Sequence, residues 1–177
     1  MKFLLRLNPI LLALAALAVV LPSHGTDSVL AASAPAVKIN VANAAPRQVE
    51  DSTQKAVARD YATAWQAMAD ALNQNRADLL SANFIGTAND KLTATVCEQG
   101  KAGLHQRIVD QGHTVDAVSY STEGSAIELH DTARLQLQLM DGNTVIHSED
   151  ATLHYVALLT AAENSCKVRM LETVPAF

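Results

Sequence analysis

The chain has 177 residues, enough for one ordinary domain once an N-terminal leader is removed. Hydrophobic residues make up 49% of it and aromatic residues only 4%, so we expect an aliphatic, alanine-rich core. The formal net charge is −5, and no block of lysine or arginine forms a local exception. This balance argues against a nucleic acid as partner, because such a partner is held mainly by basic side chains on its phosphates.

The first 25 residues have the three parts of a secretory signal peptide. Lys2 and Arg6 give a positive start, residues 10–21 form an unbroken apolar run, and small residues follow. This run is shorter than the ~20 residues of a membrane-spanning helix. Cleavage fits after Gly25 or after Ala31, so the leader ends between residue 25 and about residue 34. We expect an exported protein, periplasmic or secreted, and membrane-bound only if the leader stays uncleaved as an anchor.

Residues 26–50 are rich in Ala, Ser, Asn, Pro and Val and show no sustained periodicity. This composition predicts a flexible linker between the leader and a domain over residues 51–177. Residues 38–41 would allow one short edge strand within the linker.

The first part of the domain is predicted to be helical. Apolar residues recur every three or four positions from Val57 to Leu72, which indicates an amphipathic helix over residues 53–74. Residues 78–84 predict a short second helix or a turn. A third helix is expected over residues 90–110, with Gly112 at its C-terminal cap.

Four strands are predicted after the helices. Residues 115–121 form a short one, and residues 126–140 alternate apolar and polar side chains almost without a break. Asp141-Gly142-Asn143 is typical of a hairpin turn, and two further strands follow over residues 144–160 and 166–171. This order predicts an α+β fold, in which N-terminal helices pack on one face of a curved antiparallel meander sheet.

Asp131 interrupts the apolar face of the strand over residues 126–140. In that register its carboxylate would face the helices, where it would suit general acid or base chemistry. A β-bulge would instead turn the side chain out to water. A third interpretation is a buried acid that is satisfied by backbone donors or by Arg134. The polar row on the other face (Glu128, Arg134, Gln136 and Gln138) fits a solvated surface or a dimer surface.

Several aromatic and histidine side chains are candidates for lining a ligand pocket. They are Tyr61, Trp65, Tyr120, His154 and Tyr155. At helical spacing, Tyr61 and Trp65 are more often plain core. The six histidines form neither an HxH nor an HExxH pattern, so we expect no metal site and no cofactor.

Cys97 and Cys166 are the only cysteines. An exported chain meets an oxidising compartment, so a disulfide between them is chemically possible. Geometry decides, because Cα atoms more than ~7 Å apart cannot be bridged without backbone movement. The alternative is two separately buried thiols.

Three segments carry a resemblance to a known superfamily: ARDYATAWQAMADALNQNRADLL, IELHDTARLQLQLMDGNTV and CKVRMLE. With the order of the elements, they resemble the NTF2-like superfamily, also called the SnoaL-like or cystatin-like α+β cone, over about residues 53–174. Cys166 departs from it, since an aromatic residue is common at that position. The resemblance implies a sheet bent around a hydrophobic pocket that the helices close, and sheet faces that often pair in homodimers. Some members are isomerases, dehydratases or polyketide cyclases, and others only bind ligands or partners.

Three functions fit these patterns. The first is an exported domain that binds a small apolar ligand or a protein partner without catalysis, and the scattered polar residues favour it. The second is a pocket enzyme of isomerase, dehydratase or cyclase type, with Asp131 as general base and Tyr61, Tyr120 or His154 assisting. The third is an envelope assembly module that an uncleaved leader holds at the membrane.

Overall fold

The structure, a computed structural model, describes residue 35 and residues 37–177. The expected leader and its cleavage sites lie outside the described residues. Helix α1 covers Asp51–Gln74, a short 3₁₀ helix η2 covers Ala77–Leu79, and helix α2 covers Gly86–Lys101. None of the helices in this described part has the length and apolar character needed to cross a bilayer.

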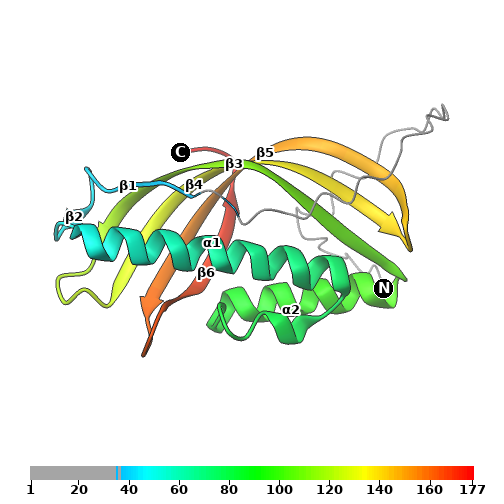
Figure 1. The fold of residues 1–177 in the computed structure, drawn as a ribbon, viewed down its shortest axis with the longest axis horizontal. Coiled ribbons are helices and arrows are strands. Elements are labelled where there is room, and N and C mark those ends of the chain that lie inside the picture. Colours follow the sequence, from blue (N-terminus) through cyan, green and yellow to red (C-terminus); the bar gives the residue numbers. More distant parts are fainter. Residues whose placement is uncertain (1–34, 36) are drawn as a thin grey trace, which may run out of the picture. The chain divides into compact units, whose positions relative to one another are not determined.

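Six strands form one mixed sheet. They are β1 (Ile39–Asn40), β2 (Ala45–Pro46), β3 (Leu104–Tyr120), β4 (Ala126–Asp141), β5 (Thr144–Ala161) and β6 (Cys166–Val174). The strand order is β1-β3-β4-β5-β6. Strand β2 pairs with the same edge of β3 as β1, but closer to the C-terminal end of β3. The long strands are antiparallel neighbours, and the helices pack on one face of the curved sheet (Figure 1). The predicted α+β cone is confirmed as two helices on an open, six-stranded sheet.

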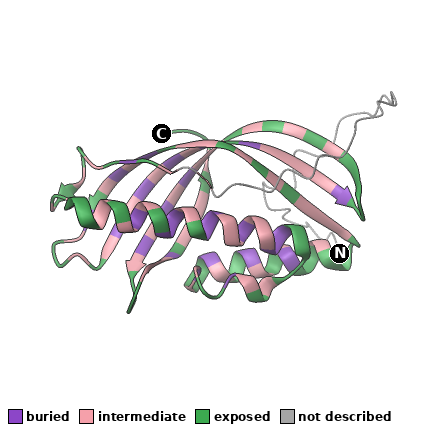
Figure 2. Ribbon diagram, in the orientation of Figure 1, coloured by how far each residue is buried: buried purple, intermediate pink, exposed green. Residues whose placement is uncertain are grey.

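Helix α1 forms where the apolar stripe predicts it. Its buried face consists of Val57, Asp60, Tyr61, Ala64, Trp65, Met68, Ala71 and Leu72 (Figure 2). The helix ends at Asn75, which adopts a left-handed conformation (φ 54°) and donates its backbone N–H to the carbonyl of Ala71. Asparagine tolerates this conformation, which makes it a common helix terminator.

The predicted third helix is wrong at its C-terminal end. Helix α2 stops at Lys101, and β3 begins at Leu104 after Gly103, whose φ of +71° favours glycine. Residues 104–112 pair with β4 instead, so β3 has 17 residues and is far longer than the predicted strand. Gly112 caps no helix: it lies inside β3 at φ +127°, where the register shifts by one residue.

The expected flexible linker is corrected at its C-terminal end. The short strands β1 and β2 both pair in parallel with β3, and the side chain of Ile39 is buried. The Gln54 side chain of α1 donates a hydrogen bond to the carbonyl of Ile39. Residues 39–46 therefore belong to the folded unit, and their two short strands cover one edge of the sheet.

Strand β4 runs through two different environments. Its inner-face side chains from Ile127 to Leu135 are buried, whereas Leu137 and Leu139 are only half-buried. Beyond Leu135 the sheet continues as three strands, since β6 pairs with β5 only from His154 to Ala161. We call this part, residues 104–112, 136–141 and 144–153, the distal wing.

Candidate functional site

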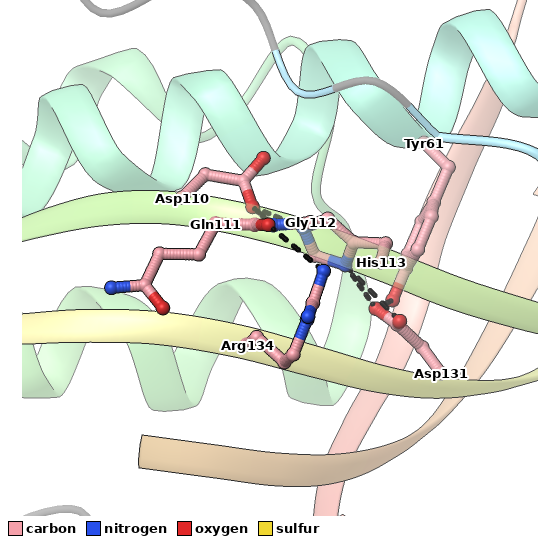
Figure 3. A network of polar contacts seen from close by, with 7 residues as sticks. All are labelled: Tyr61, Asp110, Gln111, Gly112, His113, Asp131 and Arg134. Atoms are coloured by element: carbon pink, nitrogen blue, oxygen red, sulfur yellow. Dashed lines mark hydrogen bonds and ion pairs between the residues drawn. The ribbon is translucent and has the colours of Figure 1, made fainter. Parts of the chain in front are cut away.

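The inner face of β4 carries a buried carboxylate. The side chain of Asp131 has no exposed surface, and its Oδ2 accepts a hydrogen bond of 2.9 Å from the Tyr61 hydroxyl. Nδ1 of His113, which is also fully enclosed, lies 2.8 Å from Oδ2 and 3.1 Å from Oδ1 (Figure 3). Both carboxylate oxygens are therefore engaged by side chains from other elements.

Sheet register brings these groups together. Asp131 lies opposite Val115 of β3 and opposite Tyr155 of β5. His113 precedes Val115 by two residues, so it is on the same face of β3 and diagonal to Asp131. Tyr61 reaches down from α1, whose apolar stripe faces the sheet. A β-bulge at Asp110/Gly112 directly precedes His113.

A second carboxylate lies near the other ring nitrogen of His113. Oδ1 of Asp110 accepts a hydrogen bond of 2.7 Å from the backbone N–H of Gly112 and is 3.5 Å from His113 Nε2. Within the described chain, Nε2 has no hydrogen-bond partner, and the same holds for Nε1 of the neighbouring Trp65. The imidazole is thus held between two carboxylates and against the indole ring, with 4.7 Å between ring centroids.

Burial, with a smaller contribution from the nearby carboxylate, raises the pKa values of two tyrosines. Burial raises the pKa of Tyr61 well above its usual value, and the nearby charge of Asp131 raises it further. The pKa of Tyr155 is raised for the same two reasons, with burial again the larger one. Both hydroxyls therefore stay protonated at neutral pH, so Tyr61 remains a hydrogen-bond donor to Asp131.

One space beside this network, between α1 and β6, is filled. The space between α1 and β6 does not admit a water molecule. It is lined by Tyr61, Ala64, Trp65, Met68, Phe84, Val168 and Leu171. Asp131 is not part of this lining, so the structure gives its carboxylate no contact with an open pocket there.

Of the three interpretations of Asp131, the structure has a buried acid that faces the helices. The register shifts nearby are in β3, whereas β4 is regular at this position. Its partners are the side chains of Tyr61 and His113, while Arg134 contacts the carbonyl of Gln111 instead.

The predicted pocket residues separate into two groups. Tyr61, Trp65 and Tyr155 come together in the core, and the rings of Trp65 and Tyr155 meet edge to face at 5.3 Å. Tyr120 belongs to the same buried core, and the guanidinium of Arg47 lies over its ring. His154 is on the outer face, where its Nδ1 is 3.0 Å from the Thr132 hydroxyl.

Sequence reasoning missed His113, which the predicted helix placed outside any strand. The sequence did contain a signal: His113, Val115 and Ala117 are spaced two residues apart and so lie on one face of a strand, and Val115 and Ala117 are buried. It also missed Asp60 of α1. That carboxylate is only 7% exposed and accepts a hydrogen bond of 2.7 Å from the backbone N–H of Cys166, which ties β6 to the helix.

Both cysteines are free thiols in this structure, so the disulfide left open by the sequence is not formed. Cys97 is exposed on α2, and Cys166 is half-buried at the start of β6. Burial raises the pKa of the Cys166 thiol, and the charge of Asp60 adds to the effect. Among residues 37–177, no group of three His, Cys, Asp or Glu side chains converges as metal ligands would.

Comparisons with known proteins bear on the fold. No protein-family model matches the sequence, and neither does any curated protein. The intermembrane space region of the chloroplast protein ARC6 is similar in structure, with 15% identity and a TM-score of 0.60 over 73% of this chain and 98% of that one. Aln2 from a Streptomyces species has 12% identity and a TM-score of 0.48, and the match covers 72% of this chain and 93% of Aln2. A putative scytalone dehydratase from Novosphingobium aromaticivorans has 11% identity and a TM-score of 0.45, and the match covers 66% of this chain and 83% of that one.

At such identities the likeness concerns the fold alone. The architecture described above is the α+β cone that the sequence patterns indicated, with helices on one face of an open, curved sheet. Function has to be argued from the site, because this fold supports both enzymes and binding proteins.

Proposed function

We propose that this chain is an exported NTF2-like domain that binds a protein partner through its surface and performs no chemistry inside the cone. The observation that carries the proposal is the enclosure of Asp131, whose side chain has no exposed surface. A general base must come within hydrogen-bond reach of a substrate proton. Here His113 and Tyr61 occupy both carboxylate oxygens, and the space beside α1 does not admit water. The same filling disfavours a small apolar ligand.

A homodimer through the outer sheet face, the other partner suggested by the resemblance, is less well supported. The ring of Phe177 stacks on that of His130 at 4.2 Å and meets that of His154 edge to face at 5.4 Å. A flat pairing of two sheet faces would have to displace this ring first.

Export is part of the proposal and rests on the leader pattern of residues 1–25. The similar domain of ARC6 is described as its intermembrane space region, which is compatible with a role outside the cytoplasm. N-terminal sequencing of the protein from fractionated cells tests this part. A mature end at Thr26 or Ala32 supports export with cleavage, whereas an intact Met1 in the membrane fraction supports the anchored assembly module.

The test of the interior uses Trp65, the only tryptophan, which lies against His113 and Tyr155. We expect benzene and 1-tetralone to change neither its fluorescence nor the melting temperature. Met68→Ala is the matched positive control, because Met68 lines the filled space and an apolar cavity of this kind binds benzene. A wild-type protein that is stabilised by either compound, with a shift in Trp65 emission, contradicts the proposal.

A pocket enzyme is the second candidate, and the imidazole held between two carboxylates is what favours it. An Asp131–His113 pair beside a protonated Tyr61 is a reasonable set of groups for proton transfer. Deuterium exchange at the carbon next to the carbonyl of 1-tetralone in D₂O, followed by NMR, tests this without a known substrate. We expect the rate in buffer alone. A faster rate that Asp131→Asn abolishes would establish the enzyme instead.

A further inference from the structure

One edge of the distal wing has no strand beside it in the described chain. Strand β5 pairs with β4 from Thr144 to Thr160, but β6 covers β5 only from His154 to Ala161. The other side of residues 144–153 therefore presents backbone N–H and C=O groups from alternate residues. Figure 1 shows this stretch as the free outer border of the sheet, away from α1 and β6.

This edge lacks most of the devices that keep exposed strands from pairing. Natural edges are short or carry proline, lysine or a bulge. Residues 144–153 contain no proline, lysine or arginine. Their one bulge, at Ile146 opposite Leu139 and Met140, is close to the turn and leaves residues 147–153 regular. Val145 and Ile146 are 41% and 52% exposed, and Val109 of the same wing is 42% exposed. Of the large apolar side chains in the described residues, four are largely exposed, and three of these are in the distal wing.

The charges on the edge select among possible occupants. Glu149 and Asp150 are its only formally charged side chains, and both are acidic. Antiparallel pairing of this edge with a second copy would bring two acidic pairs close together, which is unfavourable. A strand that carries lysine or arginine would meet them with opposite charge.

We propose that residues 144–153 of β5 form a docking edge for an extended, basic peptide segment of a partner protein, which adds to the wing as a further strand. Main-chain hydrogen bonds to the free edge would supply affinity, while Glu149 and Asp150 would select for lysine or arginine. The inference rests on the proposed function, since it names the surface and the chemistry of the partner.

The probe is a fluorescein-labelled peptide of eight residues that alternates Val and Thr and carries two Lys. Two matched peptides replace the lysines with Glu or two of the valines with Pro. By fluorescence anisotropy, we expect the basic peptide to bind at least tenfold more tightly than either. Bound peptide should slow amide hydrogen exchange within residues 144–153 and leave residues 154–161 unchanged, because the latter already pair on both sides.

Charge reversal provides the variants. Glu149→Lys combined with Asp150→Lys should reverse the preference, so that the acidic peptide binds more tightly. Glu98→Lys combined with Glu163→Lys makes the same change in net charge at exposed positions off the edge and should keep the basic preference. Unfolding curves of both double variants show whether a lost preference comes from a lost fold. If the edge variant does not fold, exchange protection in the wild type decides alone.

Three results overturn the inference: equal binding of all peptides, slowed exchange elsewhere but not at residues 144–153, or a dimer in sedimentation that the edge variant abolishes. The last would show that a second copy is the occupant. If the peptides fail while the interior still binds no ligand and exchanges no proton, only the docking edge is lost. Ligand binding or proton exchange in the cone overturns the proposed function whatever the peptides do.

Discussion

The two halves of β4 differ in what they bury and in what they leave open. The half from Ile127 to Leu135 lies inside the cone and holds a carboxylate with no exposed surface. The half in the distal wing holds half-buried leucines, and its neighbour β5 has a free backbone edge. The reactive group is thus out of reach, and the accessible groups are those of the backbone. The two regions differ mainly in whether their polar groups are accessible. This is why we propose a binding role for the wing and a structural role for the buried network.

The largest expected effect is at the centre of the buried half. Asp131→Ala should lower the free energy of unfolding by about 3–5 kcal/mol, because the Tyr61 hydroxyl and the His113 imidazole would stay buried without an acceptor. Urea unfolding measures this. Glu128→Ala, on the outer face of the same strand, is the matched control and should change stability by less than about 0.5 kcal/mol. Equal effects would mean that Asp131 is not a stabilising member of the network.

The same substitution at two leucines compares the halves directly. Leu129 has 0% exposure, and Leu129→Ala should cost about 2–5 kcal/mol through lost burial and a residual cavity. Leu139 points to the same face but is half-buried in the wing, so Leu139→Ala should cost about 1 kcal/mol. Similar losses in urea unfolding would show that the wing is packed as tightly as the cone.

The sequence was informative where one period dominates. The stripe of α1 and the alternation of β4 predicted both elements, and the single interruption at Asp131 marked the buried network. Residues 104–110 were ambiguous, because their apolar residues fit a helical face locally. Their strand conformation comes from pairing with β4, a partner distant in sequence. Because the predicted strand began only at residue 115, His113 was not assigned to the inner face of the sheet.

Whether the cone encloses a pocket was beyond sequence reasoning for a different reason. The filling depends on how Trp65, His113 and Tyr155 pack, and these side chains come from three separate elements. Any one of them suits either a cavity wall or a solid core. A similar limit applies to the free edge of β5, since it exists only because β6 is shorter than its neighbour.

Alkaline pH sharpens the account of the buried half. Tyr61→Phe should cost about 1.5–3 kcal/mol at pH 8 through the lost hydrogen bond to Asp131. The raised pKa of Tyr61 means that unfolding releases a proton above pH ~10, so the wild type loses stability as pH rises through that range. Tyr61→Phe has no such ionisable group. The difference in the free energy of unfolding between the wild type and this variant should therefore narrow from pH 8 to pH 11. Tyr155→Phe added to it should flatten the decline further. A constant gap in urea unfolding would contradict the burial of Tyr61.

The smallest expected effect concerns a similar hydroxyl–carboxylate contact in water. In the loop between β3 and β4, the Ser125 hydroxyl donates to Glu123 at 2.8 Å, close to the 2.9 Å between Tyr61 and Asp131. Hydrogen bonds from Ser125, the backbone and Thr122 lower the pKa of Glu123 to about 2. Because the folded pKa is the lower one, the contact stabilises the fold above pH ~4.5, and this contribution disappears as pH falls towards 2.

Glu123→Gln should therefore lower the melting temperature slightly at pH 6 and not at all at pH 2, and Ser125→Ala should reproduce most of the effect. Both losses should be far smaller than that of Tyr61→Phe, since solvent competes for exposed hydrogen bonds. If Glu123→Gln were as damaging as Tyr61→Phe at pH 6, contact geometry would outweigh burial. The contrast between the enclosed network and the open parts of the molecule would then lose its physical basis.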